Sequence, residues 1–266
     1  MDRMGFQSML INDLFSLEGK VAVAIGAGGV LAGEMAQGLA GAGANVVIAD
    51  LNPDAAKARA EKVEAIGRKA LACRADCTKK GDLQDVLKQT LDAFGRVDIL
   101  LNAAGINSGT PFFDIEESEW ERILDVDLRS VFLACQVFGK AMVESGNGGS
   151  VINISSASSG PPLSKVFTYA VAKGGVNQIT QFLAREWAPH RVRVNAILPG
   201  FFPAEQNRKL LTEERVQQIM NHTPVKRFGD ASELVAAAIF LASDKASSFV
   251  TGSLLRVDGG FAAMTI

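Results

Sequence analysis

Near the start of the chain, a short strand, a glycine turn and a helix follow one another, and this order constrains the fold more than any other feature. Lys20 to Ile25 (KVAVAI) is rich in β-branched residues and runs into Gly26-Ala-Gly-Gly29, after which apolar residues recur at helical spacing from Val30 to Ala42. Such a turn brings backbone N–H groups close to a ligand phosphate. The glycines alone predict only a tight turn.

The second expected strand ends at a carboxylate that could bind the ribose of a nucleotide. Asn45 to Ala49 (NVVIA) is apolar and ends at Asp50, which follows the glycine turn by about twenty residues. A carboxylate at this position can accept hydrogen bonds from an adenosine ribose, and it repels a 2′-phosphate. Neither Gly29 nor Leu51 supplies the basic side chain that a 2′-phosphate would need. We therefore predict a dinucleotide site, with NAD preferred to NADP.

The rest of the chain continues the alternation, so one parallel sheet with helices on both faces is expected over a single domain, residues 1–266. Further strands are expected at Lys69–Cys73, Val97–Leu101, Ser150–Ile154, Arg191–Ile197 and Ser253–Val257, and helices at Asp54–Ile66, Gly81–Phe94, Ser118–Met142, Tyr169–Trp187 and Ala231–Ala242. Met1 to Glu18 is expected to be irregular. Residues 201–229 are polar, partly helical and interrupt the pattern, which predicts a lid over the substrate.

The only tyrosine, Tyr169, lies four residues before Lys173 at the start of an expected helix. Residues at this spacing share one face of a helix. Free tyrosine has a pKa of about 10, and a neighbouring cation favours the phenolate. The pair therefore suits a phenol that takes a proton from an alcohol or returns one to a carbonyl. An exposed pair on a helix is the alternative, since the pattern is common by chance.

Composition excludes several functional classes. Lysine and arginine total 27 against 29 acidic residues, a formal net charge of −2, which gives no electrostatic basis for binding nucleic acid. No apolar run is long enough to span a membrane, and a signal peptide is not expected. The three cysteines, Cys73, Cys77 and Cys135, favour a reducing cytoplasm. His190 and His222 lie far from them in the sequence, and we predict no metal site.

From Leu17 to Phe261 the chain resembles the short-chain dehydrogenase/reductase family. The resemblance rests on landmarks that occur in the family's order: the glycine turn at Gly26, Asp50, Asp76, Asn102-Ala-Ala-Gly105, Ser156, Tyr169 with Lys173, Pro199-Gly200 and Val257-Asp-Gly-Gly260. Ser156 precedes Tyr169 by the family's usual thirteen residues. The resemblance implies a Rossmann-type, doubly wound α/β fold with about seven strands in the order 3-2-1-4-5-6-7, and a homotetramer.

The resemblance also assigns roles. It implies that Tyr169 is the acid/base, that Lys173 binds the nicotinamide ribose and lowers the pKa of Tyr169, and that Ser156 hydrogen-bonds the reacting oxygen. A hydride would then pass between a carbinol carbon and the nicotinamide. The residues implied to contact the cofactor are Gly26, Gly28, Gly29, Val30, Leu31, Asp50, Leu51, Asp76, Cys77, Asn102, Ala103, Ala104, Gly105, Tyr169, Lys173, Pro199, Gly200 and Phe202.

Asp127 departs from the family pattern, because an asparagine usually stands at this position and holds a water next to the lysine. A carboxylate can still accept that water's hydrogen bond. Its negative charge should partly offset Lys173 and raise the pKa of Tyr169. We therefore expect Asp127 to belong to the catalytic group.

Two segments resemble a sugar-acid subgroup of the family, the fructuronate (D-mannonate) oxidoreductase-like and gluconate 5-dehydrogenase-like enzymes. They are Pro199 to Arg208 (PGFFPAEQNR) and Pro162 to Val166 (PLSKV). Lys165 and Arg208 would suit a carboxylate, and Gln206 and Asn207 would suit hydroxyls, although all four could be solvated loop residues.

Two alternatives remain open. Phenylalanines could build an apolar pocket for a small cyclic ketone or secondary alcohol: Phe112, Phe113, Phe167, Phe201 and Phe202. A nucleotide-sensing binding protein with weak turnover is the alternative from another class.

Overall fold

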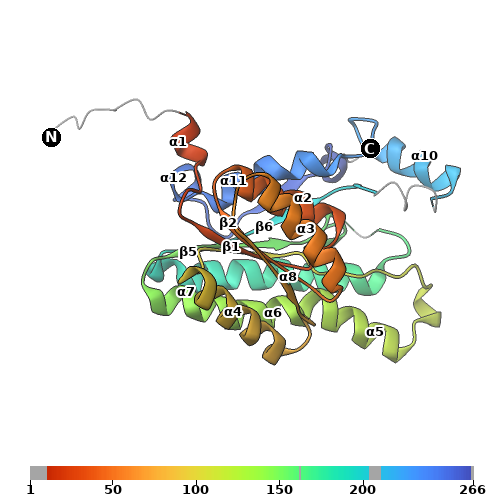
Figure 1. Ribbon diagram of the computed structural model, residues 1–266. Helices are drawn as coiled ribbons and strands as arrows, with labels where there is room; N and C mark the ends of the chain where they lie inside the picture. Colours follow the sequence, from red (N-terminus) through yellow and green to blue (C-terminus); the bar gives the residue numbers. More distant parts are fainter. Residues whose placement is uncertain (1–10, 162, 204–210, 265–266) are drawn as a thin grey trace.

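The computed structural model describes residues 11–161, 163–203 and 211–264. Its strands form one parallel sheet in the order β3-β2-β1-β4-β5-β6-β7, so the predicted fold class and strand order are confirmed. The sheet lies between layers of helices (Figure 1). The strands are β1 (Val21–Ile25), β2 (Asn45–Asp50), β3 (Ala70–Arg74), β4 (Ile99–Asn102), β5 (Gly149–Ile154), β6 (Val192–Pro199) and β7 (Leu254–Val257).

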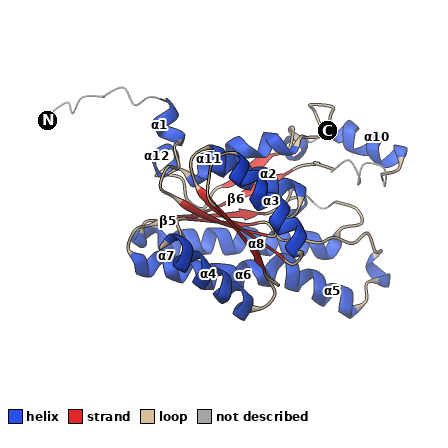
Figure 2. Ribbon diagram, in the orientation of Figure 1, coloured by secondary structure: helices blue, strands red, loops and turns tan. Residues whose placement is uncertain are grey.

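Helices cover both faces of the sheet (Figure 2). One layer holds α2 (Val30–Gly41), α3 (Pro53–Ala65) and α11 (Val235–Ala242), and the other holds α4 (Lys80–Phe94), α6 (Ser130–Ala134), α7 (Lys140–Ser145) and α8 (Phe167–Trp187). The strands serve both layers because alternate side chains point to opposite faces. In β1, Ala22 and Ala24 pack with the first layer, whereas Val23 and Ile25 pack with the second. This double burial explains the continuous apolar runs in the sequence.

The long helix predicted between β4 and β5 is present, but it is not a regular α-helix. It runs from α5 (Glu117–Leu124) through α6 to the end of α7, and two π-helical turns interrupt it at Asp125–Arg129 and Cys135–Gly139. A π turn accommodates an extra residue and changes the phase of the side chains that follow it. The first of these turns carries Asp127, whose side chain is fully buried.

Several short elements complete the described chain. The lead-in expected to be irregular contains a helix, α1 (Ile11–Phe15). The Ser243 hydroxyl, next to α12 (Asp244–Ser247), donates to the Leu14 carbonyl and ties this helix to α12. Beyond β6 lies α10 (Glu213–His222), at the right of Figure 1. Short 3₁₀ turns occur at Phe112–Asp114, Ala157–Ser159, Ala188–His190, Ala231–Leu234 and Phe261–Ala263. Over the described ranges, no helix is both long and apolar enough to cross a bilayer.

Candidate active site

A cleft of about 790 Å³ lies at the carboxyl ends of the strands, where the sheet order reverses between β1 and β4. Ligands of open α/β sheets bind at this kind of position. Most of the residues that the sequence assigns to a cofactor line this cleft: Gly26, Gly29, Val30, Leu31, Asp50, Leu51, Asp76, Cys77, Ala103, Ala104, Gly105, Tyr169, Lys173 and Gly200. Its volume is within the range of small-molecule sites.

Contacts within the protein fix the shape of the glycine turn after β1. Gly26 has a φ of +74°, and a Cβ there would lie 2.6 Å from the backbone of Ala104, so neither the conformation nor the space admits a side chain. The Gly28 N–H donates to Asp50 Oδ2 at 2.9 Å, while Asp50 Oδ1 accepts the Asn52 N–H at 2.9 Å. The carboxylate of Asp50 therefore fixes the turn to the end of β2, and its oxygens have further lone pairs for a ligand hydroxyl.

The next loop, after β3, carries a second carboxylate. Asp76 Oδ1 accepts hydrogen bonds from the Thr78 hydroxyl at 2.7 Å and the Thr78 N–H at 3.1 Å, and the hydroxyl bond is the main reason that the pKa of Asp76 is lowered. Beside it, burial raises the pKa of the Cys77 thiol to about 11. Asp76 is therefore held as an anion, whereas Cys77 stays a neutral, apolar wall of the cleft.

Ser156 stands at the end of β5 with its hydroxyl proton available. Its Oγ accepts the Ser158 N–H at 3.1 Å and the Ser158 hydroxyl at 3.0 Å. A serine hydroxyl has one proton to donate, and both of these bonds use its lone pairs. Ser155 joins the strand to α8, because its hydroxyl donates to the Lys173 carbonyl at 3.1 Å. The end of β5 and the helix that carries the tyrosine are thus held together.

Tyr169 and Lys173 lie on the first two turns of α8, and the Lys173 ammonium is 5.5 Å from the centre of the Tyr169 ring. Lys173 is only 3% exposed and donates to the Ile154 carbonyl at 3.1 Å. Because both side chains line the same cleft as Ser156, a phenol, a hydroxyl and an ammonium are available to one bound molecule. This arrangement can exchange a proton with an oxygen atom and stabilise the charge that results.

Asp127 contacts Lys173 from behind the cleft. Its Oδ1 lies 3.2 Å from the Lys173 ammonium, and its Oδ2 accepts the Ile106 N–H at 2.9 Å. Burial raises the pKa of the Asp127 carboxyl, and the charge of Lys173 opposes this effect. Gly105 makes room for the carboxylate, since a Cβ at this position would lie 2.7 Å from Oδ1.

Other predicted residues lie away from the cleft wall. Asn102 is buried and donates to Asn153 Oδ1 at 2.9 Å, while Pro199 completes β6, and neither lines the cleft. Lys165 is exposed on the loop before α8 and does not line the cleft. Gln206, Asn207 and Arg208 lie outside the described residues. The substrate roles suggested for these four residues stay predictions.

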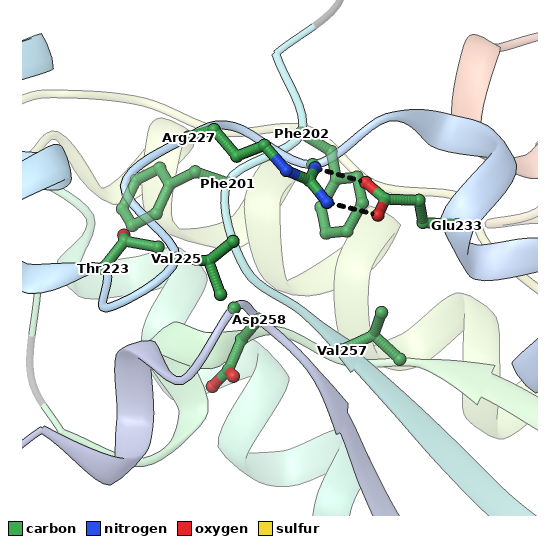
Figure 3. Close-up of a pocket in the computed structure, with 10 residues that line it drawn as sticks. Phe201, Phe202, Thr223, Val225, Arg227, Glu233, Val257 and Asp258 are labelled. Atoms are coloured by element: carbon green, nitrogen blue, oxygen red, sulfur yellow. Dashed lines mark hydrogen bonds and ion pairs between the residues drawn. The ribbon is translucent and has the colours of Figure 1, made fainter.

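Phe202 lines a separate, smaller cavity of about 200 Å³ (Figure 3). Its ring packs against Gly229, where a Cβ would lie 2.2 Å from the ring. Arg227 and Glu233 lie at this cavity, joined by two hydrogen bonds of 2.7 Å. The pair ties the segment after α10 to the turn before α11. The predicted contact of Phe202 with a cofactor stays untested.

Several residues of the cleft escaped the sequence reasoning. Ser158 orients Ser156, and Leu163 and Arg215 line the cleft together with Phe201, which the sequence had suggested only for an apolar pocket. Only Arg215 gave a signal that could have been used, as a cation within the polar excursion after β6. The described residues hold no group of three or more His, Cys, Asp or Glu side chains that could bind a metal ion.

Comparison with known proteins identifies the family. Residues 26–262 match the sequence model of a family described as enoyl-(acyl carrier protein) reductase. The fold superposes with a TM-score of 0.89 on a short-chain type dehydrogenase/reductase from Mycobacterium marinum, which is 34% identical over 95% of this chain and 99% of the other. The protein is a short-chain dehydrogenase/reductase.

Two similar proteins act on sugar acids. This short-chain dehydrogenase/reductase is 37% identical to 2-dehydro-3-deoxy-D-gluconate 5-dehydrogenase of Escherichia coli, over 96% of this chain and all of the relative. It is 33% identical to a gluconate 5-dehydrogenase from Burkholderia cenocepacia solved with NADP and tartrate, with a TM-score of 0.90 over 96% and 99% of the two chains. This dehydrogenase/reductase is therefore an oxidoreductase that interconverts a secondary alcohol and a ketone.

Proposed function

We propose that this dehydrogenase/reductase interconverts a secondary hydroxyl and a ketone on a sugar acid, using NAD(H). The convergence of Tyr169, Lys173 and Ser156 on one cleft carries this proposal. In the oxidation, Tyr169 takes the hydroxyl proton and Ser156 donates a hydrogen bond to the same oxygen. The ammonium of Lys173 stabilises the Tyr169 phenolate that accepts this proton, and in the reduction it stabilises the phenolate left when the phenol gives its proton to the carbonyl oxygen. A nicotinamide bound in the cleft would accept the hydride.

The preference for NAD rests on the acidic end of the cleft. Asp50 follows β2 and Asp76 follows β3, and both carboxylates line the wall where the glycine turn would place an adenosine. A ribose diol can donate to Asp50, whereas a 2′-phosphate would meet its negative charge. The gluconate 5-dehydrogenase named above was solved with NADP, so relatives alone do not decide the cofactor. Comparing kcat/KM for NAD⁺ and NADP⁺ tests this part of the proposal.

A sugar acid is supported by the relatives and by polar side chains that line the cleft together with Tyr169, namely Ser156, Ser158 and Arg215. The apolar alternative has less support. Phe112, Phe113 and Phe167 form an edge-to-face cluster at the surface, and of the five aromatic residues considered only Phe201 lines the cleft. We further propose that the chain is one catalytic domain with a lid at residues 201–229, and that it assembles as a homotetramer, which light scattering tests.

The decisive experiment is a screen for NADH formation with sugar acids, polyols and cyclic alcohols. We expect turnover of a sugar acid, and loss of at least about 100-fold of that turnover in Tyr169→Phe, which keeps the ring and removes the oxygen that accepts the proton. Binding of NADH, followed by fluorescence, should change little in this variant. Cofactor binding without turnover of any alcohol would favour a nucleotide sensor, and turnover of cyclic alcohols alone would favour the apolar substrate.

A further inference from the structure

A second pocket of about 350 Å³ adjoins the Tyr169 end of the cleft. Three residues line both spaces, Leu163, Phe201 and Arg215, so the pocket continues the cleft beneath α10. Its wall combines polar side chains, among them Gln218 and His222, with apolar ones, among them Ile219 and Phe261. A substrate held in the cleft can extend into this pocket, whose polar side chains can hydrogen-bond the hydroxyls or the carboxylate of an acid.

Arg215 is the cation of this junction. Its guanidinium donates to two neutral oxygens, Ser164 Oγ at 2.9 Å and Gln218 Oε1 at 3.3 Å. No carboxylate of the described chain lies within ion-pair distance of it. A guanidinium has five N–H donors, and both bonds use Nη1. The guanidinium therefore keeps N–H donors for a ligand, while its hydrogen bonds to Ser164 and Gln218 fix its orientation.

The charged side chains of the cleft wall differ in sign between its two sides. The acidic side chains of the cleft wall, Asp50 and Asp76, follow β2 and β3 on one side. Lys173 is also cationic, but the buried carboxylate of Asp127 lies 3.2 Å from its ammonium and compensates its charge. Arg215 is thus the cation of the described cleft wall that has no carboxylate within ion-pair distance, and it follows β6, on the other side of β1 from β2 and Asp50. An anionic substrate would be directed to this side.

We propose that Arg215 binds the carboxylate of the substrate, with Ser164 and Gln218 as its positioning residues. This inference rests on the proposed function, since it names the group that recognises the acid. A planar guanidinium and a carboxylate form charge-assisted, often bidentate hydrogen bonds. The residue discriminates an acid from its uncharged analogue and takes no part in the proton transfer at Tyr169.

The test compares the best sugar acid of the screen with its primary amide, which has nearly the same shape and no charge. In Arg215→Met, the ratio of kcat/KM for the acid to that for the amide should fall by about 10- to 100-fold, mostly through the KM of the acid. Arg215→Lys keeps the positive charge but loses the planar, bidentate guanidinium, and it should give an intermediate ratio. Lys245→Met, which removes an exposed cation on α12 away from both pockets, is the matched control and should leave the ratio unchanged.

Unaltered NADH affinity and thermal unfolding would show that Arg215→Met is folded. Equal losses for acid and amide, or no loss for either, in Arg215→Met and Arg215→Lys would overturn the assignment of Arg215 and leave the proposed function intact. Wild-type protein that oxidises none of the sugar acids would overturn both proposals.

Discussion

Replacing Asp127 by asparagine should shift the pH dependence of alcohol oxidation to lower pH. The substitution keeps the size of the side chain and an oxygen for the Ile106 N–H, but it removes a buried negative charge. The ammonium of Lys173 lies 3.2 Å from Asp127 Oδ1 and 5.5 Å from the centre of the Tyr169 ring. The carboxylate oxygen is therefore at most about 8.7 Å from that centre.

Two unit charges at this distance interact by about 2 kcal/mol at an effective dielectric constant of ~20, and by about 0.5 kcal/mol in bulk water. One pH unit corresponds to about 1.4 kcal/mol. The ionised carboxylate opposes formation of a second negative charge nearby, so its removal favours that charge. We expect the midpoint of the acidic limb of the kcat/KM profile to fall by about 0.4 to 1.4 pH units.

The assay is initial-rate NADH formation between about pH 6 and 10 at constant ionic strength, with the sugar acid below its KM. Asp125→Asn is the matched control. It makes the same chemical change two residues earlier in the same π turn, where Asp125 is half-exposed and pairs with Arg129. A midpoint that stays where it is in Asp127→Asn, or that moves equally in Asp125→Asn, would refute the coupling between this carboxylate and the proton transfer.

Three further predictions concern two residues at the cleft and one ion pair at the smaller cavity. In Gly105→Ala, a methyl carbon 2.7 Å from Asp127 Oδ1 should lower kcat/KM at least about tenfold, whereas Gly174→Ala, where a Cβ meets nothing within 4 Å, should not; equal kinetics would contradict the clash. In Asp50→Ser, the ratio of kcat/KM for NAD⁺ to that for NADP⁺ should fall by about 10- to 100-fold, and a constant ratio would remove this carboxylate from cofactor selection. Glu233 pairs with an arginine that lowers its pKa from 4.5 to about 2, so its stabilising contribution is present above pH 4.5 and is lost as the pH falls toward about 2. The melting temperature of Glu233→Gln should therefore lie below that of the wild type near pH 6. The difference between the two melting temperatures should narrow as the pH falls from 4.5 toward about 2. A difference that does not change with pH would argue against the ion pair.

The sheet could be predicted from the sequence because its strands are buried on both faces. Apolar runs such as Asn45–Ala49 stand out between polar helices, and the glycines mark the turns that follow them. The convergence of Ser156, Tyr169 and Lys173 on one cleft could also be expected, because Tyr169 and Lys173 share a helix face, the family resemblance points to Ser156, and parallel strands end at a common edge.

The environment of these residues could not be predicted in the same way. A π turn leaves little trace in hydrophobic periodicity, so nothing in the sequence indicated that Asp127 would approach Lys173 directly. Arg215 was missed for another reason. Its helix is polar on most sides, and its position beside the cleft depends on contacts with Ser164, about fifty residues earlier, which no local pattern encodes.

The bond between Asp50 and the Gly28 N–H has a consequence for ligand selection. The Asp50 side chain, which would bind the ribose, also accepts the hydrogen bond that holds the glycine turn in place, and this turn would contact the pyrophosphate. A dinucleotide that displaces this carboxylate forfeits a contact and at the same time loosens the loop on which its phosphates rest. Such a dinucleotide should therefore bind more weakly both at its ribose and at its phosphates, although a single residue, Asp50, causes both losses.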